Sequence, residues 1–144
     1  MAWYDKDSDG KSRLVLECKA MKEVAKDFVL KIKSDGTLFW KGSITPVENC
    51  FILEIQYPAN FPFDAPEVYV KSPKLPEDTP HLLDRPKQKL CLFHSGYAKK
   101  VGIYNPGKTT AATMLGHAIN WLLCFEVWLV LKTWPIRESP TDDD

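Results

Sequence analysis

The chain has 144 residues, and its 19 basic residues (Lys and Arg) balance 19 acidic residues (Asp and Glu), so the formal net charge is zero. This length corresponds to one domain, and a composition of 44% hydrophobic and 26% charged residues is typical of a globular protein with its own core. Zero net charge gives no overall positive field to attract nucleic acid or an anionic membrane surface, so neither is an expected partner.

The N-terminal part predicts a helix followed by a β-hairpin. The first residues contain no positively charged leader before an apolar stretch, so we expect a cytoplasmic protein. Ser12 can cap a helix in which apolar residues recur every three or four positions, and this helix should end near Lys26. Residues 28–33 and 37–41 are rich in β-branched and aromatic side chains, and the Ser-Asp-Gly turn at 34–36 between them predicts a hairpin.

Two more strands are predicted, at 50–56 after the turn Glu48-Asn49 and at 67–71 after a proline-rich stretch. Together with the hairpin they should form one antiparallel meander of four strands over about 28–71. Five prolines between 72 and 107 exclude long helices and central strands, so this region should be mostly ordered loop. A loop of this length in a compact domain usually carries function.

A long apolar helix is predicted after this loop, from 111 to about 132, with Thr109 or Thr110 as its cap and Trp134-Pro135 as its end. Of its first 21 residues, 16 are apolar, so the helix should lie at the centre of the core or under a partner. The longest strongly apolar run, 121–131, is shorter than the roughly 20 residues that a membrane span needs, so no membrane association is expected.

The loop segment 80–97 holds the residues best suited to chemistry. Four cysteines lie far apart without a CxxC pair, so neither a zinc site nor another cofactor is expected. Cys91 lies in the loop, whereas Cys18, Cys50 and Cys124 should be small buried hydrophobic residues. Between positions 84 and 108 one acidic residue, Asp84, accompanies six basic ones: Arg85, Lys87, Lys89, Lys99, Lys100 and Lys108. Positive surroundings favour the nucleophilic thiolate, although a buried loop cysteine with a solvated basic rim is the alternative.

Several motifs occur along the chain in a recognisable order. The stretch YPANFPFDAPEVYV at 57–70 is similar to a YPxxPPxVxF motif, and His81 lies ten residues before Cys91-Leu92. Tyr104-Asn105-Pro106 follows the cysteine where a Trp-Ser-Pro motif would be, and Thr109 then opens the next helix. In this order the motifs resemble those of the ubiquitin-conjugating enzymes, whose histidine lies in a His-Pro-Asn motif before the active-site Cys-Leu.

The resemblance covers about residues 11–135 and implies an α+β ubiquitin-conjugating-enzyme fold. Its parts are an N-terminal helix, a four-stranded antiparallel meander, an active-site loop and C-terminal helices. The whole of 1–144 is then expected to be one domain, with a solvated acidic tail at 138–144.

The resemblance also implies roles for particular residues. Cys91 corresponds to the acyl-accepting cysteine, which takes the C-terminal carbonyl of a protein as a thioester and passes it to an amine. His81 corresponds to a mainly structural histidine. The asparagine of the family motif falls on Leu83, which has no hydrogen-bond donor, so its role is lost or passes to Asn105, to His94 or to backbone amides. His94 can pair with Cys91 or lie in solvent.

The Trp-rich segment INWLLCFEVWLVLKTWP resembles the ending of bacterial members of this family, most of all the stand-alone conjugase-like protein of CBASS antiphage operons. The implied partner is a protein C-terminus, that of a cGAS-like nucleotidyltransferase or of a ubiquitin-like protein, and an activating enzyme is a further implied partner. The partner's acidic tail would meet a local basic rim: Arg85, Lys87, Lys89, Lys99 and Lys100.

Two other functions compete with a conjugase. The first is a catalytically inactive conjugase-like scaffold that binds its partner non-covalently, which the missing asparagine at Leu83 supports. The second is a cysteine hydrolase that uses Cys91 and His94. The sequence shows no third residue to orient that pair and no nucleophile elbow, so the hydrolase is the weaker of the two.

Overall fold

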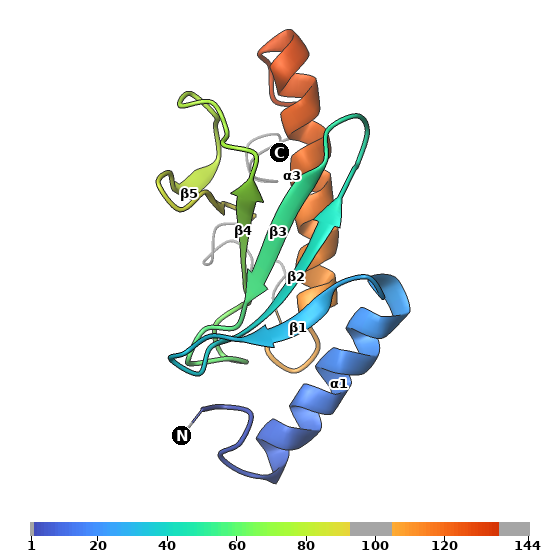
Figure 1. Ribbon diagram of the computed structural model, residues 1–144, viewed down its shortest axis with the longest axis vertical. Coiled ribbons are helices and arrows are strands. Elements are labelled where there is room, and N and C mark those ends of the chain that lie inside the picture. Colours follow the sequence, from blue (N-terminus) through green and yellow to red (C-terminus); the bar gives the residue numbers. More distant parts are fainter. Residues whose placement is uncertain (1, 93–104, 136–144) are drawn as a thin grey trace, which may run out of the picture.

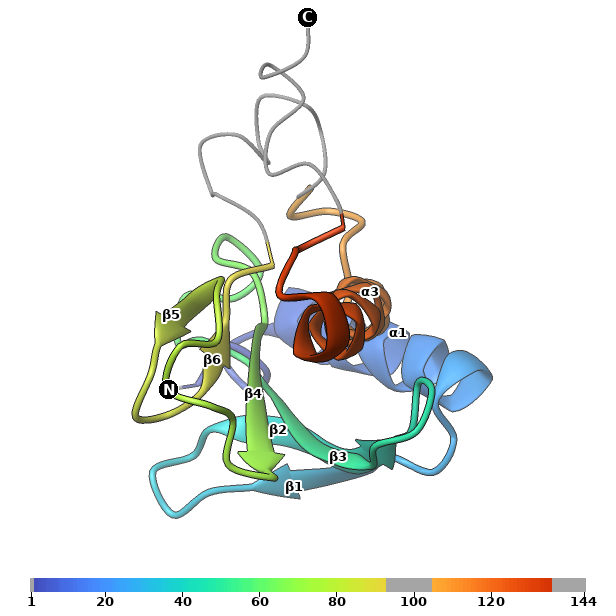
Figure 2. The same cartoon turned by 90° about the horizontal axis from the view of Figure 1, so that it is seen from above.

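The computed structural model describes residues 2–92 and 105–135, and in them two long helices lie on one face of a twisted antiparallel sheet (Figures 1 and 2). The helices are α1 (Ser8–Val24) and α3 (Ala111–Leu131). The sheet has the order β1-β2-β3-β4-β6-β5. Its strands are β1 (Val29–Ile32), β2 (Leu38–Ile44), β3 (Phe51–Gln56), β4 (Glu67–Ser72), β5 (Leu82–Asp84) and β6 (Lys89–Leu90). The predicted α+β class is confirmed, but the sheet has six strands where four were predicted.

Helix α1 begins at Ser8, four residues before the predicted cap, Ser12. The actual N-cap is Asp7, whose carboxylate accepts a hydrogen bond from the backbone N–H of Gly10 at 2.9 Å. Gly10 lies against the carbonyl of Trp3, where a Cβ atom would collide with that oxygen. The regular spacing of apolar residues begins only at Leu14, after the first turn of the helix. The sequence pattern therefore could not predict that turn.

The predicted hairpin at 34–36 is confirmed as the connection between β1 and β2. Gly36 takes a φ of 91°, in the left-handed region that glycine adopts without strain. The carboxylate of Asp35 accepts a hydrogen bond from the backbone N–H of Thr37 at 2.9 Å, and the hydrogen bonds from Thr37 lower the pKa of this carboxyl below its usual value. The side chain of Asp35 therefore stabilises the turn in which it lies.

Two short strands, β5 and β6, lie in the region that was predicted to be loop. Tyr69 of β4 pairs with Lys89 of β6, and β6 pairs in turn with β5, so the sheet continues past its fourth strand. Pro80 and Pro86 lie just outside these strands and limit β5 to three residues, while β6 has only two. Strands this short show no alternation of polar and apolar residues that a sequence pattern could detect.

Helix α3 is the central element of the core, which is the first of the two positions that its apolar sequence predicts. Nine of its residues are buried, and they pack against β3, β4 and α1. Its N-cap is the predicted Thr110, which forms a reciprocal capping box with Thr113. Trp121 and Trp128 are both buried in this core. In the part of the chain that the structure describes, α3 is the one helix after the loop, where more than one was predicted.

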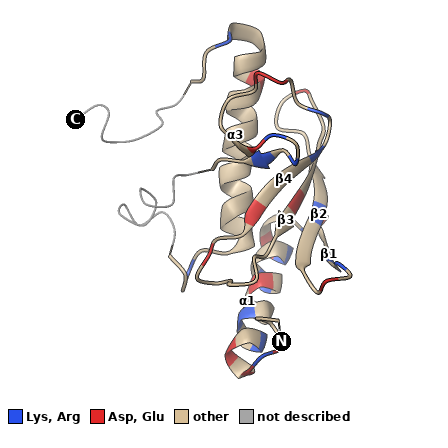
Figure 3. Cartoon of the chain, turned by 90° about the vertical axis from the view of Figure 1, so that its left-hand side faces the viewer, with Lys and Arg blue, Asp and Glu red and all other residues tan. Residues whose placement is uncertain are grey.

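By length and composition, α3 is also long and apolar enough to cross a membrane. The run 121–131 underestimates the length of the apolar segment, because it covers only about half of the helix. The structure buries 44% of the most apolar window of α3 inside the protein, and several large apolar side chains near its C-terminal end are exposed. Figure 3 shows α3 almost without charge, while charged residues are spread over α1, the sheet and the loops.

Candidate functional site

Cys91 directly follows β6, where the chain leaves the sheet. Its backbone N–H donates a hydrogen bond to the carbonyl oxygen of His81 at 3.0 Å. The preceding residue, Leu90, is only 3% exposed, whereas Cys91 itself is half-buried. The backbone of Cys91 is therefore fixed on one side by the core and on the other by a hydrogen bond, and its side chain is partly accessible.

His81, which directly precedes the edge strand β5, organises this part of the sheet through its backbone. Its φ of 58° lies in the left-handed region, which histidine visits more often than most residues. The same carbonyl oxygen that binds Cys91 also accepts a hydrogen bond from the indole Nε1 of Trp121 at 3.1 Å. The imidazole ring lies 4.9 Å from the ring of Trp134, which lies 5.2 Å from that of Trp121. The carbonyl oxygen of His81 therefore links the backbone of Cys91 to the side chain of Trp121 on α3.

Arg13 of α1 holds the chain where it returns from the predicted active-site loop. Its guanidinium donates to the carbonyl of Pro106 at 2.6 Å and to that of Thr109 at 2.7 Å. The hydroxyl oxygen of Thr109 accepts a hydrogen bond from the backbone N–H of Asn105 at 2.8 Å, and the carboxamide oxygen of Asn105 accepts one from Gly107 at 2.9 Å. The chain just before α3 is thus tied to α1 and to itself.

Glu17, which is fully buried, orients Arg13. One carboxylate oxygen accepts a hydrogen bond from Arg13 Nε at 3.1 Å, and the other accepts from the hydroxyl of Tyr57 and the backbone N–H of Ala111, both at 2.8 Å. The Tyr57 oxygen also accepts a hydrogen bond from Trp40 Nε1 at 2.8 Å. Burial, and then the charge of Glu17, raise the pKa of Tyr57 above its usual value, so the hydroxyl stays protonated and donates.

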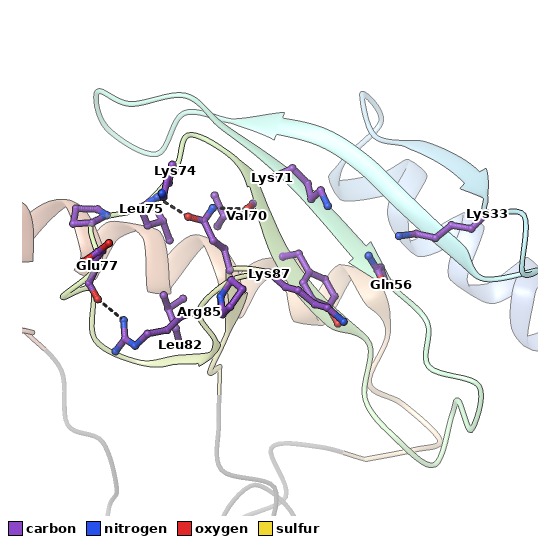
Figure 4. Close-up of a pocket in the computed structure, with 14 residues that line it drawn as sticks. Lys33, Gln56, Val70, Lys71, Lys74, Leu75, Glu77, Leu82, Arg85 and Lys87 are labelled. Atoms are coloured by element: carbon purple, nitrogen blue, oxygen red, sulfur yellow. Dashed lines mark hydrogen bonds between the residues drawn. The ribbon is translucent and has the colours of Figure 1, made fainter.

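A groove with a volume of about 960 Å³ lies between β4 and the β5–β6 turn (Figure 4). Residues 74–77 form another part of its lining. Among the residues that the structure describes, the lining carries one carboxylate, that of Glu77, and five basic residues: Lys33, Lys71, Lys74, Arg85 and Lys87. We call this feature the basic groove.

Comparison with known proteins adds the family to this geometry. A sequence model that describes type II CBASS E2 proteins matches residues 17–141. The chain belongs to this family. No curated protein matches the chain. Membership of the type II CBASS E2 proteins confirms the resemblance found in the sequence and implies a role in CBASS antiphage defence. It also suggests a conjugation-type activity and a protein partner from the same operon.

In this type II CBASS E2 protein, some of the predicted site residues lie in the part of the chain that the structure describes and others lie outside it. Cys91 and His81 lie side by side, and Asn105 lies at the start of the segment that returns to α3. Leu83, at the position of the family asparagine, is 59% exposed on β5. The other predicted residues lie outside the part of the chain that the structure describes: His94, Lys99, Lys100 and Tyr104.

The three described members of the predicted basic rim do not share one environment. Lys89 Nζ lies 2.6 Å from a carboxylate oxygen of Glu67, so its charge is paired. Arg85 and Lys87 are exposed and line the basic groove. The predicted rim is thus only partly a single surface.

Several residues of the site were not predicted. Lys71 follows the alternation of β4, in which Tyr69 and Lys71 share the face opposite the buried Val70, so the strand pattern could have placed it. Lys33 and Lys74 reach the groove through the packing of the sheet and its loops, for which the sequence carries no local signal.

The remaining cysteines only partly fit the prediction. Cys124 is buried and Cys18 is half-buried, and burial raises the pKa of both thiols. Cys50 is exposed, so the prediction that it is buried is wrong. It precedes β3 at the end of a turn, just before the first buried position, Phe51. Among residues 2–92 and 105–135, no group of three His, Cys, Asp or Glu side chains could hold a metal ion.

Proposed function

We propose that this chain is a cytoplasmic E2-type conjugase with a ubiquitin-conjugating-enzyme fold, in which Cys91 carries the C-terminus of a partner protein as a thioester. The proposed partner is a cGAS-like nucleotidyltransferase of the same antiphage operon. One observation carries this proposal. In a chain of the CBASS E2 family, a partly accessible cysteine lies where the family's acyl acceptor is expected, with its backbone held by His81.

The proposed chemistry is acyl transfer between sulfur atoms. The thiolate of Cys91 attacks the carbonyl carbon of a C-terminus that an activating enzyme already holds as a thioester. A new C–S bond forms as the old one breaks, and the enzyme's sulfur leaves as a thiolate. An amine can then attack the new thioester to give an amide, while the thiolate of Cys91 leaves and the amine loses a proton to solvent. Because thiol exchange is nearly isoenergetic, positioning contributes most of the catalysis.

Hydrogen bonds at both ends of the segment 92–105 support a positioning role for the protein. The carbonyl of His81 fixes Cys91 before this segment, and Arg13 binds the carbonyls of Pro106 and Thr109 after it. Both anchors belong to the folded body of the domain. Neither His81 nor Arg13 needs to take part in proton transfer for this purpose, so we propose both as positioning residues.

The donor that stabilises the oxyanion in this proposal does not come from Leu83. The carboxamide oxygen of Asn105 is occupied by the N–H of Gly107, so its NH₂ group is the part that can act as a donor. His94 and backbone amides are the other proposed donors. An Asn105→Asp variant, which keeps the accepting oxygen and loses the NH₂ group, tests this assignment by its rate of acyl transfer.

The decisive experiment is co-expression of the chain with its operon neighbours, followed by purification without reductant. The proposal predicts a larger covalent species that disappears on addition of thiol and is absent in Cys91→Ser, or is replaced there by a thiol-stable oxyester. Cys50→Ser is the matched control, because Cys50 is exposed and would form any unspecific disulfide. A thiol-sensitive species that survives Cys91→Ser and disappears in Cys50→Ser contradicts the proposal.

The second candidate function is a scaffold that binds the partner without acyl transfer, and the exposed Leu83 favours it. Under this alternative, the partner co-purifies equally with wild type and Cys91→Ser, and no covalent species forms under any condition. Replacing Leu83 by asparagine would then be expected to leave the complex unchanged, whereas a conjugase lacking one donor should react faster with that donor restored.

A further inference from the structure

The basic groove is a preformed feature of the fold, because Gln88 fixes its walls. The side chain of Gln88 donates to the carbonyls of Val70 at 2.7 Å and Pro73 at 3.1 Å, and accepts from the N–H of Leu75 at 2.6 Å. Its backbone oxygen accepts from the N–H of Val70 at 3.0 Å. These bonds hold the β5–β6 turn, the end of β4 and the following loop in one arrangement. A ligand therefore meets a surface whose shape is already set.

Most of the positive charge in the groove is not neutralised by the protein. Lys71, Lys74 and Lys87 form no ion pair with any residue in the described ranges 2–92 and 105–135. The guanidinium of Arg85 is oriented by hydrogen bonds to two backbone carbonyls, of Glu77 at 2.9 Å and Thr79 at 2.6 Å (Figure 4 shows the first). These neutral partners leave its charge available to a carboxylate, which a guanidinium binds through paired N–H donors.

The rest of the lining favours a peptide over a nucleic acid. Its apolar part is aliphatic: Val70, Leu75, Pro76, Leu82 and Pro86. Sites for single-stranded nucleic acid present aromatic rings on which bases stack. The described lining has one such ring, that of Tyr69, whose hydroxyl donates a hydrogen bond to Glu67 at 3.1 Å. The volume of about 960 Å³ exceeds what one carboxylate group would fill. Acidic side chains alternating with aliphatic ones match this combination of charge and apolar surface.

The groove lies close to the proposed nucleophile along the sheet. Leu82 lines the groove and pairs with Leu90 of β6, the residue directly before Cys91. We propose that the basic groove binds an extended acidic and aliphatic segment of the partner protein, so that the partner's C-terminus is delivered toward Cys91. This inference rests on the proposed function for the identity of the partner, while the groove's preference for acidic peptide rests on its own residues.

A binding experiment with the full chain tests the groove without any conjugation. The probe is a short fluorescein-labelled peptide of alternating glutamate and leucine, and its control has glutamine in place of glutamate. Wild type and Cys91→Ser should bind the acidic peptide equally, and the double variant Lys71→Glu/Lys74→Glu should bind it about tenfold more weakly or worse at low ionic strength. The matched control reverses two exposed lysines of the α1 region, Lys19 and Lys26, and should change the affinity less than about twofold.

Three results would overturn the proposal. The first is equal affinity of wild type and the Lys71/Lys74 variant for the acidic peptide, when thermal unfolding shows both to be folded. The second is equal binding of the acidic and the glutamine peptides. The third is tighter binding of a single-stranded oligonucleotide of equal charge, lost in the same variant, which would make the groove a nucleic-acid site. Lys87→Gln, which only removes one charge, provides a milder variant and should weaken peptide binding severalfold.

The same variants separate this inference from the proposed function. If the partner forms a thiol-sensitive adduct with wild type, the Lys71/Lys74 variant should need about tenfold more partner to reach half-maximal adduct, with an unchanged rate at saturation. Equal adduct formation at limiting partner would refute the groove and leave the conjugase standing. Groove-dependent peptide binding in a chain that never forms an adduct would refute the conjugase and leave the groove standing.

Discussion

The buried carboxylate of Glu17 provides the strongest test of how this fold holds its site. Glu17 is fully buried and accepts three hydrogen bonds, from Arg13, Tyr57 and Ala111. Glu17→Ala leaves all three donors without this acceptor and removes the partner of a nearly buried guanidinium, whose side chain is 12% exposed. Breaking a buried ion pair from one side costs about 3–5 kcal/mol.

This free energy can be converted into a melting temperature. An unfolding entropy of about 2.1 cal/mol/K per residue over 144 residues makes 1 kcal/mol equal to about 3 °C. Glu17→Ala should therefore lower Tm by about 9–15 °C. Glu17→Gln keeps an acceptor for Tyr57 and Ala111 and loses only the charged bond to Arg13, so a loss of about 2 kcal/mol, or about 6 °C, is expected.

The assay is thermal unfolding followed by circular dichroism, with Glu23→Ala as the control. Glu23 is an exposed glutamate on the same helix, so its replacement should change stability by less than about 0.5 kcal/mol. If Glu17→Ala and Glu23→Ala have the same Tm, the buried network does not stabilise the domain and the reasoning fails.

Three further predictions concern other parts of the fold. Gly10→Ala should lower Tm because the added Cβ would collide with the Trp3 carbonyl. Gly116→Ala should raise Tm by about 2–3 °C, because no atom lies within 4 Å of the position that its Cβ would take. Equal effects of the two substitutions would contradict the packing at α1. Burial lowers the pKa of His117 below 6.5, so the unfolded chain takes up its proton first and stability falls as the pH drops from about 7 to about 5. Urea unfolding of His117→Asn should show a smaller fall, and an equal fall would refute this origin. Glu126→Ala removes three hydrogen bonds to the turn between β2 and β3, so it should lower the free energy of unfolding in urea by about 1–3 kcal/mol. An unchanged free energy of unfolding would show that other contacts stabilise this turn.

Local signals explain what the sequence predicted correctly. The hairpin at 34–36 depends on a glycine and an aspartate that act within three residues, and the start of α3 depends on Thr110 and a partner three residues later. The resemblance to a family implied a structural role for His81 through its side chain, whereas the bond that the structure shows to Cys91 comes from the backbone carbonyl of His81.

What the sequence could not predict depends on contacts between distant residues. Nothing near Arg13 or Glu17 indicates that they meet residues 106–111, because charged residues at i and i+4 usually form an exposed pair on a helix. The lysines of the basic groove come from separate segments, and only the folded sheet brings them together. The exposure of Cys50 likewise depends on where a turn ends, and element boundaries are the least certain part of sequence interpretation.

The distance along the chain between Arg13 and its two carbonyl partners has a consequence for synthesis. Pro106 and Thr109 follow Arg13 by 93 and 96 residues, so the ribosome makes them last among these groups. At a translation rate of about 5–20 residues per second, Pro106 and Thr109 are synthesised about 5–20 seconds after Arg13. The delay between Glu17 and its partner Ala111 is similar. A nascent chain that already displays Cys91 therefore lacks the second anchor of its loop. Under the proposed function, acyl transfer should therefore begin only after residues 106–111 have left the ribosome, and a half-made chain would not capture the proposed partner.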